Sequence, residues 1–428
     1  MGQLAKFSKK AIIVYGCQQV AEGTSVNQDS PSGTITTTVA SATVTGSGTS
    51  FTTQVAVGAY LYTTTDAIIG RVKTVTDNTH IVLYDVVPGS ATSQSAGVQA
   101  VATAVTGVAF KVGLGPQNAL AGLNANFSIE NDTEEFQFVG DELSRDVATV
   151  LKDTYGKLDF ETIMPVRGAT AGSDPVESEL PFADWFQSCG FAIVLSTGGA
   201  DYWTATNSVS SNAYMTIEVR LSSPDLNNSQ KTYILTDARG NIDLDAVIGA
   251  KPKLKFNYQG NLGTIAQKFA LVADFQSVKT DLSPTFKSTT IGLSALDLYS
   301  GSVEPSPSGS SNVCFDKLNA PNVTGFEYNR YQTGCLDGWS KTAVPTDVDI
   351  TVLEDSAAAT YNPTDNIEAL HRLTIRYGDT AALSTAGQRI EIVFHKLRLA
   401  NVVRSEVADY FGLDLKFRNA GTTDIKFY

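Results

Sequence analysis

Short runs in which β-branched or aromatic residues alternate with small or polar ones recur along most of the chain. Such alternation places every second side chain on one face of a strand, so it predicts β structure rather than helix. In the first hundred residues, strands are expected within 33–51 and at 59–65, 68–75 and 80–87. Further strands are expected at 126–132, 135–140, 157–166, 213–221, 231–238 and 253–258.

Two segments depart from this alternation and predict helices. Pro181 suits the first turn of one helix and Gly190 its end. Between them, apolar side chains share one helical face at Phe182, Trp185, Phe186 and Cys189. A shorter helix is expected from Asp365 to Leu373, because Asp365 and Glu368 have the spacing of a capping box.

Residues 31–107 differ in composition from the rest of the chain. They contain 25 Ser or Thr residues but only five charged ones. Because aromatic residues such as Phe51 and Tyr60 recur regularly, a folded β-module is favoured over a disordered Ser/Thr stalk. We therefore predict a small inserted module at 31–107, within a first β domain made of residues 1–30 and 108–300.

The order of elements in this first domain recurs in shorter form after a Pro/Ser/Gly-rich stretch at 301–312. In that second order, 326–332 stands in place of 127–132, and 347–355 in place of 157–165. Likewise, 389–397 matches 231–238, and 413–417 matches 253–256. An internal duplication is therefore favoured, with residues 301–428 forming a second, shorter β domain.

Composition and motifs exclude several classes of function. The 428 residues carry a net charge of −13, so the surface is expected to repel nucleic acid phosphates rather than bind them. No phosphate-binding loop, zinc-ligand spacing or nucleophile motif is present, so neither enzymatic activity, a cofactor nor a metal is expected. The four cysteines are either all free, or Cys314 pairs with Cys335.

Targeting and membrane signals are also missing from the sequence. No apolar run approaches the roughly 18 residues of a membrane-spanning helix. The run at 11–15, which follows three lysines, is too short for a signal peptide. We therefore expect the protein to be made and kept in a cytoplasm, or to leave it within an assembly.

One segment is strongly acidic. Residues 127–146 contain a single base, Arg145, among seven acids: Glu130, Asp132, Glu134, Glu135, Asp141, Glu142 and Asp146. The simplest interpretation is a solvated face. The specific alternative is a surface past which a polyanion moves without binding.

Residues 126–191 carry an ordered pattern that resembles a known family. An acidic strand is followed by an extended arm, the strand Lys157-Leu-Asp-Phe-Glu161, a loop of small residues, and an aromatic helix ending in Cys189-Gly-Phe191. Together these resemble the tail tube (major tail) proteins of long-tailed bacteriophages. The C-terminal stretch 412–427 is similar to the last strands of that family, and the Thr-rich segment resembles small β-modules of phage tail proteins.

The resemblance implies a tail-tube-like β-sandwich or barrel of two roughly orthogonal sheets with a flanking helix. Such subunits join edge to edge into rings, which stack into the hollow tube through which DNA passes to the host. The implied partners are copies of this chain, other tail proteins and DNA in transient passage. The implied location is the virion, with assembly in the host cytoplasm.

If the domain is duplicated, three chains would supply the six domains that rings of this family use, whereas a single domain would require six chains. The trimer is favoured. Two alternatives stay open: a tail component that forms one ring without polymerising, such as a distal tail or terminator protein, and an adhesin that binds glycans through 31–107. The presence of a contractile sheath is also open.

The resemblance places candidate contact residues in and around the acidic segment. The arm expected to touch the neighbouring ring includes Val139, Arg145, Lys152, Tyr155 and Gly156. The residues expected to face the lumen are Glu130, Asp132, Glu134, Asp141 and Glu142. The module at 31–107 is expected to project outward as decoration.

Overall fold

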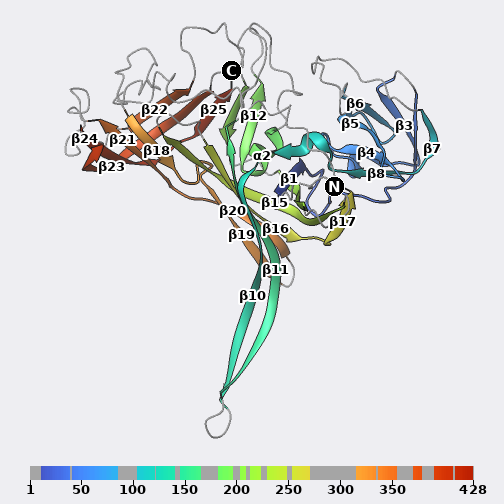
Figure 1. Cartoon of the computed structure of the whole chain (residues 1–428), viewed down its shortest axis with the longest axis horizontal. Coiled ribbons are helices and arrows are strands. Elements are labelled where there is room, and N and C mark those ends of the chain that lie inside the picture. The colour runs from blue at the N-terminus through green and yellow to red at the C-terminus, as the bar shows by residue number, and fades with distance from the viewer. Residues whose placement is uncertain are drawn as a thin grey trace, which may run out of the picture.

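The computed structural model consists almost entirely of antiparallel β-strands, so the mainly β fold predicted from the alternation is confirmed (Figure 1). The residues that the structure describes are 11–38, 41–84, 104–120, 122–139, 145–164, 182–195, 203–208, 213–222, 229–247, 253–269, 315–333, 336–353, 370–377, 390–407 and 410–427. They form a 16-stranded sheet, a 7-stranded sheet and one separate strand pair.

The 7-stranded sheet is the Ser/Thr-rich module. Its strands pair in the order β7-β2-β3-β6-β5-β4-β8. Their bounds are β2 (Thr34–Thr37), β3 (Thr43–Ser47), β4 (Tyr60–Thr63), β5 (Ile68–Val75), β6 (His80–Leu83), β7 (Val105–Val108) and β8 (Phe110–Gly113). The short helix α1 (Phe51–Gln54) closes the module, with the ring of Phe51 edge-on to Phe110 at 5.9 Å between centroids. The sheet therefore extends past residue 107, where the sequence suggested a boundary.

The module packs directly on the main sheet. Tyr15 and Cys17 of β1 (Ala11–Gln18) belong to the module's apolar core. The Cys17 thiol lies 3.4 Å from the Val57 carbonyl oxygen, and the Asn118 amide donates to the Gly58 carbonyl oxygen at 3.1 Å. Asn118 ends the 3-10 helix η1 (Pro116–Asn118). These contacts hold the module against the rest of the molecule.

The 16-stranded sheet contains strands from both halves of the chain. From the first half come β1, β9 (Ala119–Leu120), β10 (Leu123–Val139), β11 (Arg145–Ile163), β12 (Phe191–Leu195), β13 (Trp203–Asn207), β14 (Met215–Ser222), β15 (Ser229–Val247), β16 (Lys253–Leu262) and β17 (Ala266–Phe269). From the second half come β18 (Phe315–Ala320), β21 (Thr346–Leu353), β22 (Leu370–Tyr377), β23 (Ile390–Val407), β24 (Tyr410–Asn419) and β25 (Thr423–Phe427). The separate pair is β19 (Phe326–Thr333) with β20 (Leu336–Ala343).

The aromatic helix predicted at the centre of the chain is confirmed as α2 (Ala183–Ser188). The face predicted to be apolar is buried, with Trp185 edge-on to Phe160 at 5.4 Å between centroids. The Tyr258 hydroxyl donates to the Trp185 carbonyl oxygen at 2.8 Å, which ties the helix to β16. Phe427 of β25 also packs against Phe186 of α2, so both halves of the chain share one apolar core.

The second predicted helix, 365–373, is wrong where the structure describes it. Residues 370–373 belong to β22, which pairs with β23 along its whole length. Leu373 and Ile375 are buried with a spacing of two residues, and the His371 ring packs on Phe417 at 5.8 Å between centroids. This long-range pairing prevails over the local capping pattern, whose Asp365 and Glu368 lie outside the described residues.

The two halves repeat one order of strand pairing. In the first half β11 pairs with β16, β16 with β15, and β15 with β14; in the second, β21 pairs with β24, β24 with β23, and β23 with β22. The returning strand β17 pairs with the start of β15, and β25 with the start of β23. A register shift also occurs at the same place, after Met215 in β14 and after His371 in β22.

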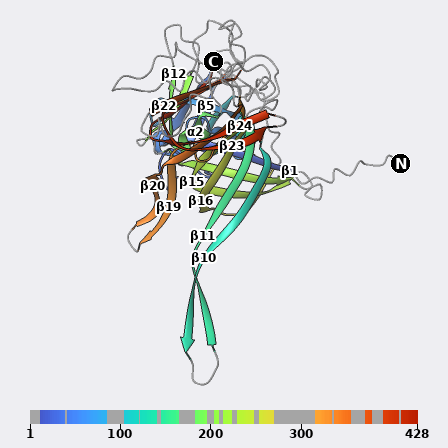
Figure 2. The same ribbon diagram turned by 90° about the vertical axis from the view of Figure 1, so that its left-hand side faces the viewer.

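The hairpins that precede these units differ. β10 and β11 form one continuous hairpin that projects far from the sheet (Figures 1 and 2). The strands expected at 126–132 and 135–140 are thus one strand. In the second half the hairpin is divided: β18 pairs with β21 in the sheet, while β19 and β20 pair with each other and with no other described strand. The sheet position expected for 326–332 is therefore taken by β18.

Candidate assembly surfaces

The projecting hairpin is the most extended surface of the molecule. β10 and β11 stay paired from Leu123 opposite Glu161 to Val139 opposite Arg145. The register shifts once in the projecting part, between Asp132 and Thr133, so that Lys152 is the extra residue of a β-bulge. We call residues 132–153 the arm. It contains three of the five predicted inter-ring residues, Val139, Arg145 and Lys152.

The other two predicted inter-ring residues lie at the base of the arm, in the sheet. Tyr155 and Gly156 pair with β10 on one side and with Asn261 and Gly260 of β16 on the other. Gly156 is buried, and a Cβ there would come within 2.3 Å of a Leu235 methyl carbon. A larger side chain at 156 would therefore require the Leu235 side chain to move or β11 to shift. These two residues anchor the arm.

The predicted lumen residues are only partly brought together. Glu130, Asp132 and Glu134 follow one another along β10, opposite Tyr155, Asp153 and Val150. Glu130 accepts a hydrogen bond from the Ser128 hydroxyl at 2.8 Å. Asp141 and Glu142 lie outside the described residues. Glu130 sits beside the main sheet, whereas Asp132 and Glu134 belong to the arm.

A second polar surface was not singled out from the sequence. Alternate residues of the central strands face away from the core, and we call this surface the polar sheet face. Its charged members are Lys157, Asp159, Glu161, Asp243, Asp245, Lys253, Lys255, Lys317, Asp347, Asp349, Arg398, Asp414, Lys416 and Arg418. Acidic and basic side chains are interspersed, in contrast to the acidic segment 127–146.

Hydrogen bonds and ion pairs order the polar sheet face. The Asn257 amide donates to Asn241 at 2.9 Å and to Asp243 at 3.0 Å. Lys253 pairs with Glu161 at 3.3 Å across β16 and β11. Burial raises the pKa of Asp159 above its ordinary value, although Lys255 and Lys157 oppose that rise. Several side chains of this face are therefore held by hydrogen bonds or ion pairs, and charges of both signs are interspersed on it.

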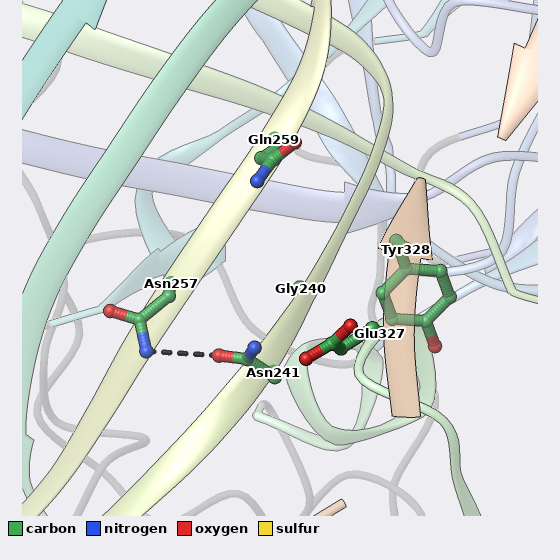
Figure 3. A pocket seen from close by; sticks show the side chains of 6 residues that line it. All are labelled: Gly240, Asn241, Asn257, Gln259, Glu327 and Tyr328. Carbon is green, nitrogen blue, oxygen red and sulfur yellow. Dashed lines mark hydrogen bonds between the residues drawn. The ribbon is translucent and has the colours of Figure 1, made fainter. Parts of the chain in front are cut away.

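A polar hollow lies where β19 passes beside β15 and β16 (Figure 3). Glu327 points toward Asn241 in this hollow. The residues that line it are Gly240, Asn241, Asn257, Gln259, Glu327 and Tyr328. Their side chains supply amides, the Glu327 carboxylate and the Tyr328 phenol, all of which can form hydrogen bonds.

The sequence did contain a signal for the polar sheet face. In β16 every second residue from Leu254 to Gly260 is buried, and the residues between them are polar. Alternation predicts a polar face on each strand. It does not say which strands lie side by side, so the face could not be assembled from single strands.

Two strand edges of the central sheet carry exposed apolar side chains. Leu123 and Ile129 of β10 are 42% and 41% exposed, and Val403 of β23 is 47% exposed. β10 pairs with β11 alone, and residues 399–407 of β23 pair with β24 alone, among the strands that the structure describes. Each edge thus presents backbone hydrogen-bonding groups beside apolar side chains.

No protein-family model matches the chain, and no match is found among curated proteins. Across the described ranges, no group of three or more His, Cys, Asp or Glu residues is placed to hold a metal ion. Nor does that part of the chain contain a helix long and apolar enough to cross a membrane. Cys17 and Cys189 are free and buried, and Cys314 and Cys335 lie outside the described residues.

Proposed function

We propose that this chain is a structural subunit that assembles with copies of itself into stacked rings, which form the hollow tail tube of a phage. The observation that carries this proposal is the junction between its two halves. Two four-stranded units with the same pairing order are already joined edge to edge, through β15 and β18. A chain built in this way is suited to further edge-to-edge joining.

The polar sheet face is suited to line the channel. The opposite face of the sheet carries the apolar core and α2. In a closed ring, the core and α2 would lie on the outside and the polar sheet face on the inside. Because acidic and basic residues are interspersed on the polar face, phosphates meet no continuous line of cations there. DNA would then pass without the counterion release that drives tight binding. Glu130, at the edge of this face, remains a candidate lumen residue.

The arm is suited to join one ring to the next. It extends well beyond the sheet as a twisted antiparallel hairpin (Figure 2). A free two-stranded ribbon is only marginally stable in water by itself, so it gains most by packing on another surface. The neighbouring ring supplies such a surface in our proposal, and three chains, each with two units, would complete one ring.

Electron microscopy of the purified protein tests this function. Hollow tubes with a regular axial repeat, formed as the protein concentration is raised, are the expected result. End-on class averages then distinguish three subunits from six. Monomers alone, at all salt and protein concentrations, would refute the proposal. A single closed ring that never stacks would instead favour a non-polymerising tail component, and retention of the protein on host cells a glycan-binding adhesin.

A further inference from the structure

Inside the chain, the pairing of β15 with β18 covers one strand edge of the sheet. β14 pairs with β15 only as far as Ala238, and beyond it the same edge of β15 is covered by β18. Across this junction Leu244 faces Ala320, Asp245 faces Asn319 and Ala246 faces Leu318. The Val323 amide continues the pairing by donating to the Ile242 carbonyl oxygen at 2.7 Å.

β23 has the equivalent edge in the second half. β22 pairs with β23 only as far as Arg398, and β24 pairs with the opposite edge of β23 as far as Val407. In the strand-pairing register, Val402 faces Leu415 as Ile242 faces Phe256. Arg404 faces Leu413 as Leu244 faces Leu254. Residues 404–407 of β23 thus correspond to residues 244–247 of β15.

The outer edge of β10 corresponds to the edge of β18 that pairs with β15. Asn126 of β10 faces Asp159 of β11, as Asn319 of β18 faces Asp349 of β21. The outer edge of β10 has no strand partner in the described part of the chain. Asn126 is exposed, and the exposed side chains of Leu123 and Ile129 flank it.

We infer that β23 of one copy pairs with β10 of a second copy, antiparallel and in the register of the β15–β18 junction. Ser405 then lies opposite Asn126, Arg404 opposite Phe127, and Glu406 opposite Ala125. This inference rests on the proposed function, because it names the strands that close each ring. The exposed apolar side chains on both edges become covered when the edges pair.

The charges at this edge explain how a single chain avoids premature pairing. Leu244 and Ala246 of the inner junction are buried, whereas the corresponding Arg404 and Glu406 are exposed. Charged residues on an edge strand disfavour unspecific strand pairing. The junction between copies is therefore weaker than the junction inside the chain, and it forms only when many copies combine.

Disulfide trapping tests the register. The test protein carries Ser405→Cys and Asn126→Cys, with Cys314→Ser and Cys335→Ser to remove other candidate thiols. Facing Cα atoms of antiparallel strands lie about 4.5–5.5 Å apart, within the range a disulfide spans. Tubes assembled under reducing conditions and then oxidised should give covalent multimers on a non-reducing gel, ending at a closed ring of three chains.

The matched control replaces Ser405→Cys by Asn401→Cys, on the same strand and the same face. Four residues displace this thiol by about 13 Å, so Asn401→Cys with Asn126→Cys should remain monomeric on the gel. Tubes in which the control pair links, or in which neither pair links, would overturn this register while leaving the tube function intact. Failure of the wild-type protein to assemble at all would refute the proposed function itself.

Discussion

The two halves of this molecule contribute to one sheet, but their hairpins differ. In the first half β10 and β11 run without interruption from the sheet into the arm. In the second half a turn at 321–325 separates β18 from β19, so that the hairpin of β19 and β20 is not part of the main sheet's strand order. The difference lies in the backbone, because Asn322 has a φ of +48° and Gly325 a φ of +70°.

This turn shows how a few residues redirect one architecture. Pro321 has no amide hydrogen to donate to a ladder, and Gly325 adopts positive φ without the penalty that a Cβ imposes. Asp243 of β15 accepts a hydrogen bond from the Asn322 amide at 2.8 Å. A residue of the first half thus stabilises the turn in the second half. The hairpin of the first half projects from the molecule, whereas the hairpin of the second half packs on its own chain.

The largest expected effect comes from removing the arm. Replacement of residues 132–153 by Asn-Gly leaves Asn131 paired with Thr154, closed by a two-residue turn that suits a hairpin. We expect single rings and a complete loss of tubes in electron micrographs. The matched control shortens the other hairpin, replacing 330–339 by Asn-Gly, and it should still form tubes. Loss of tubes in the control alone would reverse the roles assigned to the two hairpins.

Trp185→Ala tests whether the halves are one folding unit. Trp185 is 1% exposed and contacts aromatic rings of β11 and β16. Removal of a buried Trp side chain costs about 3–5 kcal/mol, which chemical denaturation would measure. Because the core is shared, amides of β24 and β16 should lose protection from hydrogen exchange together. The 71% exposed Phe411 offers a control, whose change to Ala should have little effect.

Asp243→Ala removes the hydrogen bond between β15 of the first half and the turn at 321–325 of the second half. It leaves the Asn322 amide and the Asn257 side chain without this acceptor. We expect a loss of about 1–3 kcal/mol, because two hydrogen bonds to a charged group are lost from a half-buried site. Hydrogen exchange at 321–325 should accelerate. Asp245→Ala, two residues further along the same face and exposed, should leave that exchange unchanged.

The smallest expected effect concerns a carboxylate that links strands of both halves. Asp424 of β25 accepts hydrogen bonds from His395 at 2.8 Å and from Thr206 of β13 at 2.7 Å. Burial alone would raise the pKa of Asp424, but these hydrogen bonds outweigh it and hold the pKa below its ordinary value.

Because the folded-state pKa of Asp424 is lowered, its stabilisation is complete above the unfolded pKa, about 3.9. It is lost as the pH falls through the lower folded value. Asp424→Asn should therefore reduce stability by about 1 kcal/mol at neutral pH and have less effect in strong acid. Melting temperatures of the two proteins across that pH range would measure this. An equal difference at every pH would contradict the assignment.

Much of the secondary structure was predictable from local pattern. Alternation predicted β14, β15 and β16, and the spacing of Trp185 and Phe186 predicted α2. The recurring order of elements also anticipated the repeated strand pairing. Local pattern was wrong at His371, where a capping box competed with a strand whose partner, β23, comes 13 residues after β22 ends.

The candidate surfaces were less predictable. The acidic segment was visible in the sequence, but its division between the sheet and the arm was not. Gly156 was proposed as an arm residue, yet its contact with Leu235 makes it an anchor. Nothing in the local sequence of β11 indicates that contact, because Leu235 is more than 70 residues away.

The sequence by itself determined many of the strands and which face of each of them is apolar, since both follow from a period of two residues. Only the tertiary structure decided which strands are neighbours: β15 with β18, β25 with β13, and no described partner for the outer edge of β10 or for that edge of β23 beyond Arg398. The physical reason is that backbone hydrogen bonds are the same for every residue type. Packing across the shared core therefore selects the partner of each strand, and in the described part of the chain it leaves the outer edge of β10 and residues 399–407 of β23 without a partner on one side.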